Sequence, residues 1–293
     1  MIFLQLLVNG ILLGGIYALI SIGLTLIFGV VRIINFAHGE FLMLSMYFTF
    51  FLFSFLGLDP YVALFIVAPI LFLLGLMTQR FIIQPLMGAP PLSQVFATFG
   101  LSIALQSLAL FLWTGNFRSI KTPYAESILR LRNIMIPFPR LVMFLVAIAI
   151  IIALYAFLHR TYLGSAITAV VQDRIAALLV GINVRGAYLL TFGIGSACVG
   201  IAGALLMPSY YAHPTIGLSF VMMAFVVVVL GGLGNMLGAI VAGIIIGIVE
   251  SFTGFFIDFQ LSPVFYYAIF IAVLLIKPSG IFGMVGEEEM GLK

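Results

Sequence analysis

Polar residues within or beside long apolar stretches are the first candidates for chemistry in this sequence. Asn35, His38 and Glu40 follow residues 1–31, which contain no Asp, Glu, Lys or Arg, and Glu250 follows another charge-free stretch. Such groups are costly at membrane depth and usually serve a purpose there. Asn35 or His38 could cap a following helix, with Glu40 at its positive N-terminal end. All four residues could also line a path for a polar solute.

A second set of polar residues lies between residues 163 and 185, in a segment that separates two apolar stretches. A short helix over 166–180 would carry its polar residues on one side and end at Gly181, because glycine commonly stops helices. Ala176 and Ala177 would let another surface approach closely, which favours docking on a partner. The alternative is a helix that lies at the membrane interface.

The sequence offers little for metal binding or catalysis. His38, His159 and His213 share no metal-ligand spacing with one another or with Cys198, the single cysteine. No Gly-x-Ser-x-Gly motif marks the nucleophile of a hydrolase. None of the lysines follows a glycine, as the Walker A loop of an ATP-binding protein requires. We therefore expect no catalytic residue, no metal site and no cofactor in this chain.

The composition requires a membrane. Of the 293 residues, 64% are hydrophobic and only 7% are charged, with a net charge of +3, whereas soluble domains carry about 25% charged residues. Such a small number of charges cannot cover a globular surface with solvated groups. Lipid must therefore be the main solvent of this chain. The basic residues are too scattered to bind nucleic acid, and they fit loops that orient membrane spans.

Charge-free windows locate the elements that must position these residues. A spanning helix needs about 20 mostly apolar residues, and the windows lack the alternation of strands, so strands are not expected. The prediction is an all-α polytopic integral membrane protein with eight or nine helices in one bundle, a single domain over 1–293, and a broken element near 32–40. The first helix is too long for one upright span and the seventh is too short. The expected helices cover 2–31, 41–58, 61–77, 95–113, 141–158, 188–207, 220–231, 236–254 and 264–276.

Small residues recur at every fourth position in three of these helices. On a helix, each set forms one stripe along which a neighbouring backbone can approach closely. This pattern predicts tight packing of the bundle and indicates no chemistry. The stripes are Gly10, Gly14 and Ala18; Ser196, Gly200 and Ala204; and Ala239, Gly243, Gly247 and Ser251.

The charges in the loops give a narrow prediction of orientation. Five spans precede residue 159, so the loops 114–140 and 159–187 should lie on opposite sides of the membrane. With 159–187, Arg32, Arg80 and the C-terminus in the cytoplasm, seven cations lie inside and five outside. The positive-inside rule favours this arrangement by a small margin.

Four blocks of the sequence, in order and covering nearly the whole chain, resemble branched-chain amino acid ABC transporter permeases of the LivH type. The first contains Ile33-Ile34-Asn35-Phe36-Ala37-His38-Gly39-Glu40. The others are Gln172-Asp173 to Gly181-Ile182-Asn183, Val229-Leu230-Gly231-Gly232-Leu233-Gly234, and Leu274 to Gly283. The resemblance implies a transporter subunit that imports leucine, isoleucine and valine across a prokaryotic plasma (inner) membrane.

The resemblance also implies partners. These are a second permease of the LivM type, two cytoplasmic ATPases that bind ATP and magnesium, and an external or periplasmic substrate-binding protein. The segment of about 160–187 would be the cytoplasmic loop that couples to the ATPases, and the C-terminus would be cytoplasmic as well. The coupling contact would be made by Gln172, Asp173, Arg174, Ala176, Ala177 and Gly181.

The sequence departs from the family pattern at a few positions, which leaves the solute open. Met223 stands where lysine is frequent, Asn235 and Leu237 replace a common serine and proline, and His213 precedes Pro214. Similar permeases move urea and short amides, so such a solute is an alternative. A different alternative is an ion-coupled secondary carrier with Glu40, Glu250 or Asp258 as a proton relay.

Overall fold

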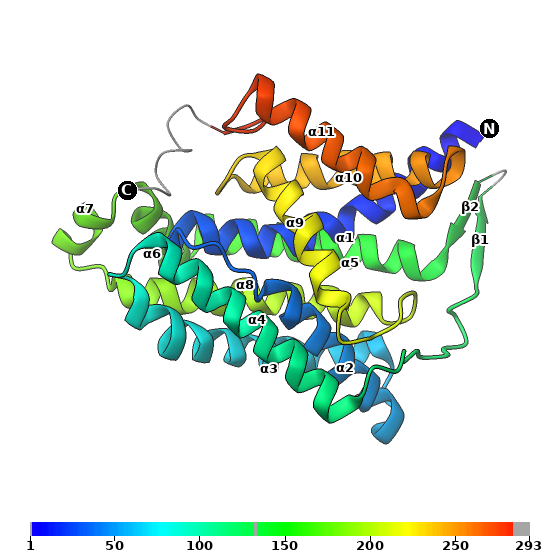
Figure 1. Ribbon diagram of the computed structural model, residues 1–293, viewed down its shortest axis with the longest axis horizontal. Helices are drawn as coiled ribbons and strands as arrows, with labels where there is room; N and C mark the ends of the chain where they lie inside the picture. Colours follow the sequence, from blue (N-terminus) through cyan, green and yellow to red (C-terminus); the bar gives the residue numbers. More distant parts are fainter. Residues whose placement is uncertain (1, 132–133, 284–293) are drawn as a thin grey trace.

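The computed structural model describes residues 2–131 and 134–283, and this part of the chain is mainly helical (Figure 1). Within these residues, eight helices are long and apolar enough to cross a membrane, which confirms the predicted polytopic class. They are α1 (Ile2–Val31), α2 (His38–Leu56), α3 (Pro60–Thr78, continued by a π-helical turn at Gln79–Ile83 and a 3₁₀ turn at Gln84–Leu86), α4 (Pro91–Trp113), α5 (Phe138–Arg160), α8 (Val184–Leu206), α10 (Met236–Phe256) and α11 (Ser262–Ile276, after a 3₁₀ turn at Phe259–Leu261).

Three further helices are shorter. They are α6 (Tyr162–Gln172), α7 (Arg174–Leu179) and α9 (Ile216–Gly231). The last of these covers the segment expected at 220–231, and its 16 residues are too few for a full crossing at about 1.5 Å per residue. The uncertainty between eight and nine spans therefore resolves to eight in the described part of the chain.

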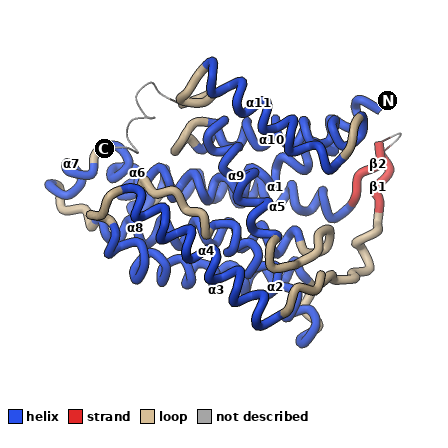
Figure 2. The backbone as a smooth tube through the Cα atoms, viewed as in Figure 1, coloured by secondary structure: helices blue, strands red, loops and turns tan. Residues whose placement is uncertain are grey.

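A two-stranded antiparallel sheet lies in the long loop between α4 and α5, where no strand was expected (Figure 2). Strands β1 (Ile128–Leu131) and β2 (Ile134–Pro137) pair with Leu129 opposite Ile136. The prediction of no strands was wrong because it rested on the apolar windows, and this hairpin lies outside them. Gln5 joins the start of α1 to the hairpin by a side-chain bond to the backbone oxygen of Met135 (2.6 Å).

The loops before and after α5 lie at opposite ends of the molecule, as the span count predicted (Figure 1). The hairpin and the start of α1 mark one end, which we call the hairpin end. Helices α6 and α7 mark the other, which we call the α7 end. The segment after α11 also reaches the α7 side, because the amide of Phe282 donates to the backbone oxygen of Gly231 at the end of α9 (3.1 Å).

The predicted break near 32–40 folds back into the bundle. Helix α1 ends at Val31, and the ring nitrogen Nε2 of His38 lies 3.0 Å from the backbone oxygen of Ile20. Ile20 precedes Val31 by eleven residues, so α2 begins about 16 Å back along α1 at 1.5 Å per residue. Figure 1 shows this return, with α2 starting in the interior of the bundle.

The predicted caps of α2 were wrong. The N-cap of α2 is Ala37, which makes no side-chain cap hydrogen bond, and His38 is the first helical residue. Asn35 instead stabilises the turn before α2, because its Oδ1 accepts a hydrogen bond from the amide of Ala37 (3.1 Å). One of these two side chains was expected to cap the helix, but the return of the chain directs His38 to α1 instead. Glu40 does lie in the first turn of α2, as predicted.

The stripes of small residues bring backbones into contact. A Cβ atom added at Gly10 would lie 2.6 Å from Cα of Ile248, and one added at Gly14 would lie 2.6 Å from Cα of Ile244. The stripes of α1 and α10 therefore face each other, and no larger side chain fits between them without moving a helix. The stripe of α8 serves the same purpose against α3, where Gly75 lies against Ser196.

Candidate functional site

Glu40 occupies a point where two helix N-termini meet inside the bundle. Its side chain is 1% exposed, and Oε1 accepts a hydrogen bond from the hydroxyl of Ser102 on α4 (3.1 Å). Helix α9 begins beside it, because a Cβ added at Gly217 would lie 2.6 Å from the backbone oxygen of Gly39 and 2.9 Å from Oε2 of Glu40. The positive ends of α2 and α9 both favour a negative charge at this position.

Asn35 and His38 are fully buried beside this junction. Asn35 holds the turn before α2, and His38 fixes that turn against α1 through the oxygen of Ile20. A Cβ added at Gly23 would lie 3.1 Å from Cε1 of His38, so the imidazole lies directly on the α1 backbone. These contacts position the start of α2 and therefore the carboxylate of Glu40.

Glu250 forms a separate contact with α1. Its Oε2 accepts a hydrogen bond of 2.7 Å from the hydroxyl of Tyr17, and both residues are buried. Tyr17 precedes Ile20 by three residues, so the contacts of Glu250 and His38 with α1 lie about one helical turn apart. The structure thus brings His38 and Glu250 to the middle of α1, although Glu250 comes from a distant part of the sequence. Asn35 and Glu40 lie on either side of His38, in the turn before α2 and in its first turn. The role of all four residues in a path stays a prediction.

The segment predicted to couple to the ATPases consists of two helices, α6 and α7, whereas one helix over 166–180 was expected. Asp173 ends α6 and starts α7, because its Oδ1 accepts hydrogen bonds from the amides of Ile175 (2.8 Å) and Ala176 (3.0 Å). An aspartate that caps a new helix in this way separates it from the preceding one. Gly181 does stop the second helix, with a φ of +82° that favours glycine.

The six predicted coupling residues do not share one surface. Gln172, Asp173 and Arg174 line a cavity of about 770 Å³ at the α7 end, which we call the α7 cavity. The guanidinium of Arg174 lies 5.8 Å from the ring centre of Tyr188 on α8. Ala176 is exposed, but Ala177 faces inward and is only 3% exposed. The two alanines therefore have different surroundings, contrary to the expected pair at one docking face.

Apolar side chains form the exposed surface of α7. Leu179 is 83% exposed and Val180 is 76% exposed, and Ile175 and Leu178 are also exposed. Sequence reasoning concentrated on the polar residues and missed this surface. The signal was present, because these four residues are apolar in a segment too short to cross a membrane.

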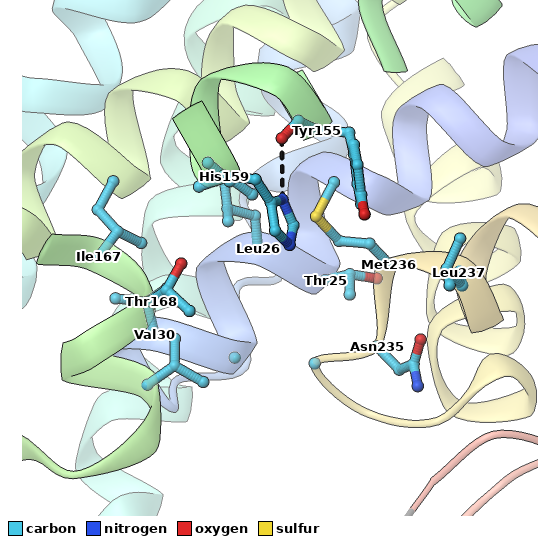
Figure 3. Close-up of a pocket in the computed structure, with 14 residues that line it drawn as sticks. Thr25, Leu26, Val30, Tyr155, His159, Ile167, Thr168, Asn235, Met236 and Leu237 are labelled. Carbon is cyan, nitrogen blue, oxygen red and sulfur yellow. Dashed lines mark hydrogen bonds between the residues drawn. The ribbon is translucent and has the colours of Figure 1, made fainter. Parts of the chain in front are cut away.

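A second cavity, of about 380 Å³, lies where α5 and α6 meet α1 and the start of α10 (Figure 3). His159 and Tyr155 project from α5, with Nδ1 of His159 2.9 Å from the backbone oxygen of Tyr155. Thr168 of α6 and Thr25 of α1 face the same space. This cavity thus separates part of α6 from the core helix α1.

The hairpin end carries a polar cavity of about 750 Å³. Lys121, Glu126 and Arg140 line it together with tyrosines of the loop after α8. The hydroxyl of Tyr124 donates to Oδ2 of Asp59 (2.7 Å), and burial raises the pKa of this tyrosine, which keeps it a neutral donor. This bond holds the loop beside the start of α3. Sequence reasoning treated these charges as orientation signals and missed the cavity.

A bundle of membrane-length helices, with two helices that start in its interior and an amphipathic element at one end, is the architecture of a multi-pass membrane protein. The chain belongs to the family described as "Branched-chain amino acid transport system / permease component", whose family model matches residues 6–274. This confirms the resemblance to LivH-type permeases.

Individual relatives are similar to this chain over nearly its full length. The chain is 32% identical to the high-affinity branched-chain amino acid transport system permease protein BraD of Pseudomonas aeruginosa, with 98% of each chain covered. It is 33% identical to the corresponding protein LivH of Escherichia coli, again with 98% of each chain covered. A probable LivH of Methanocaldococcus jannaschii is 28% identical, with 94% of this chain and 91% of the relative covered. No solved structure matches this chain.

Two of the departures from the family pattern have local explanations. Met223 is 4% exposed on α9, so it packs in the apolar interior. Asn235 is the N-cap of α10, where Oδ1 accepts from the amide of Gly238 (2.9 Å) and Nδ2 donates to the backbone oxygen of Phe282 (3.1 Å). Asparagine and serine are both good N-caps, so this exchange keeps the local function.

Proposed function

We propose that this chain is one of two permease subunits of an ATP-driven importer of leucine, isoleucine and valine in a prokaryotic plasma membrane. A LivM-type permease completes the pore, and an external binding protein delivers the amino acid. Two cytoplasmic ATPases bind ATP and magnesium, so this chain needs no cofactor of its own. The names of the relatives support the solute, because they are branched-chain amino acid permeases.

The surface of α7 is the observation that carries this proposal. Four exposed apolar side chains, those of Ile175, Leu178, Leu179 and Val180, project at the α7 end of the bundle. An exposed apolar group rimmed by polar residues such as Asp173 marks a contact with another protein or with the membrane. A groove on an ATPase would bury these side chains, and the α7 cavity behind them would let the element move.

The α7 end is then the cytoplasmic side. Arg160, Arg174 and Arg185 lie in or beside the coupling helices, and the segment after α11 packs at this end as well. This arrangement agrees with the positive-inside rule. The hairpin end and its polar cavity would face outward, where a binding protein releases a zwitterionic amino acid.

Introducing a charge on the exposed apolar surface of α7 tests the proposal. We expect the wild-type chain, taken from its native membrane in mild detergent, to carry two ATPases and a second permease. Leu179→Glu should insert normally but lose the ATPases and ATP-driven leucine uptake. Leu129→Glu places the same change at an exposed residue of the hairpin and should keep both. ATPases that remain bound to the Leu179→Glu variant would contradict the proposed docking surface.

The ion-coupled carrier remains the second candidate, because Glu40 and Glu250 are acids buried inside the bundle. Asp258 is a weaker relay candidate, since its Oδ1 accepts from the amide of Gln260 and caps the turn before α11. Uptake that collapses on addition of a protonophore while ATP is held constant would favour the carrier. Uptake that depends on ATP and is unchanged by the protonophore would exclude the carrier. Urea and short amides, tested as competitors of leucine, decide the alternative solute.

A further inference from the structure

An apolar cavity of about 470 Å³ lies between α1, the segment 32–36, the start of α4 and the second half of α9. Its volume is in the range of sites that hold small organic molecules, about 300–1,000 Å³. The rings of Phe28, Phe36 and Phe225 form much of its wall, with Val228 and Val229 beside them. The ring centres of Phe36 and Phe225 are 5.0 Å apart. The cavity therefore suits a compact, branched apolar group.

Two polar residues, Arg32 and Gln94, also line this apolar cavity. Pro91 lines it beside them, and the same three residues line the α7 cavity. The two cavities therefore adjoin at these residues. A molecule that leaves the apolar cavity past Arg32 reaches the space bordered by the coupling helices.

Gln94 presents an acceptor at this junction. Its Nε2 donates to the backbone oxygens of Leu86 (3.0 Å) and Ala89 (3.2 Å). Both amide hydrogens are thus engaged, which fixes the orientation of the side chain. The amide oxygen then accepts from a donor on a bound molecule.

Arg32 is in a backbone conformation that favours glycine. Its φ is +59°, in the left-handed region, and its amide closes the last turn of α1 by donating to the oxygen of Phe28 (2.9 Å). A side chain with a Cβ is unfavourable in this conformation. Such an outlier points to a function of the side chain, here a guanidinium between two cavities.

We propose that the apolar cavity is a binding subsite for the branched-chain amino acid on the cytoplasmic half of the path. The side chain of the amino acid lies among the aromatic and valine residues. Its carboxylate pairs with Arg32, because a guanidinium binds a carboxylate through two parallel hydrogen bonds. Its ammonium group donates to the amide oxygen of Gln94. This inference rests on the proposed function and adds a site to it.

A larger side chain in the apolar cavity tests the subsite. In the complete transporter reconstituted in proteoliposomes, Val229→Phe should lower leucine uptake at low substrate about tenfold or more. Valine uptake should fall less, because its shorter side chain needs less of the filled space. Val241→Phe on α10 is the matched control, since Val241 lines none of these cavities. Equal losses for both substrates, or no loss for leucine, would overturn the subsite.

Two substitutions of Arg32 separate the role of its side chain from the effect of its backbone conformation. Arg32→Gly removes the unfavourable left-handed conformation and should raise the thermal stability of the chain while it lowers leucine uptake. Arg32→Lys keeps the charge without the two parallel hydrogen bonds and should fall between the glycine variant and the wild type. A glycine variant that transports leucine as well as the wild type would show that Arg32 does not bind the substrate.

A diazirine analogue of leucine locates the bound amino acid directly. During ATP-driven transport, light should attach this probe to peptides that contain Phe225 or Val229, and excess leucine should prevent the labelling. Labelling that excess leucine does not reduce would indicate a lipid chain in the cavity and overturn the inference. Wild-type uptake without any label there would overturn the subsite alone. A complete transporter without ATP-driven leucine uptake would instead contradict the proposed function.

Discussion

The hydroxyl of Tyr17 donates a 2.7 Å hydrogen bond to Oε2 of Glu250, and this bond joins α1 to α10 inside the bundle. The same two helices also meet along their stripes of small residues, where Gly14 lies against Ile244. Close backbone packing and one buried polar bond therefore hold the longest helix of the molecule to α10. One contact is van der Waals packing and the other is a hydrogen bond, so separate substitutions can test them.

Tyr17→Phe removes the donor of the Tyr17–Glu250 bond and leaves a buried carboxylate with one partner fewer. We expect a loss of about 1–3 kcal/mol in stability, measured as a lower midpoint of thermal unfolding in detergent. Glu250→Gln keeps an oxygen that accepts from Tyr17 and should cost less. Tyr162→Phe is the control, because Tyr162 is 83% exposed. Equal midpoints for Tyr17→Phe and Tyr162→Phe would show that the bond does not stabilise the fold.

Gly14→Ala tests the packing of α1 on α10. The new Cβ would lie 2.6 Å from Cα of Ile244, and backbone atoms can make room only if the helices separate. Overpacking of this kind costs about 1–3 kcal/mol, so the unfolding midpoint should fall. Gly100→Ala is the matched control on α4, because nothing lies within 4 Å of its added Cβ. That exchange should be neutral or stabilising by about 0.5–1 kcal/mol, and similar losses in both variants would contradict the packing argument.

Asp173→Ala removes the cap of α7. The amides of Ile175 and Ala176 lose their acceptor, which costs about 1 kcal/mol at a helix N-terminus. Since α7 has only six residues, we expect faster hydrogen exchange of its amides and a several-fold fall in leucine uptake. Asp173→Asn keeps the cap and should retain most of the uptake. If both variants transport equally poorly, the negative charge matters and the capping argument is wrong.

The positions of the helices could be predicted from the sequence because span length and the absence of charge are local properties. The break after Val31 was predictable for the same reason, since a polar segment follows a long apolar one. The return of that segment by about 16 Å was not, because it depends on the contact of His38 with Ile20 and on the packing of Gly39 against Gly217. Such pairings between distant residues leave no pattern in a single sequence.

The candidate site was predictable only in part. Glu40 and Glu250 were found from their cost in an apolar environment, but their partners, Ser102 and Tyr17, lie 62 and 233 residues away. The inward position of Ala177 depends on the start of a new helix at Asp173. An aspartate within an amphipathic pattern is equally consistent with one continuous helix and with two.

Glu40→Gln decides between a structural and a functional role for the charge at the junction of α2 and α9. The amide oxygen of glutamine still accepts from Ser102, so the hydrogen bond on Oε1 survives the exchange. The exchange loses the favourable interaction with the two helix N-termini but lowers the cost of burying a charge, so thermal stability should change little. A carboxylate that faces the solute should nevertheless be needed for transport, and we expect leucine uptake to fall about tenfold or more. Ser102→Ala is the matched variant, since it keeps the charge but removes the bond, and its uptake should fall less. Full transport by Glu40→Gln would exclude Glu40 from the path and leave it a structural role between the two helix N-termini.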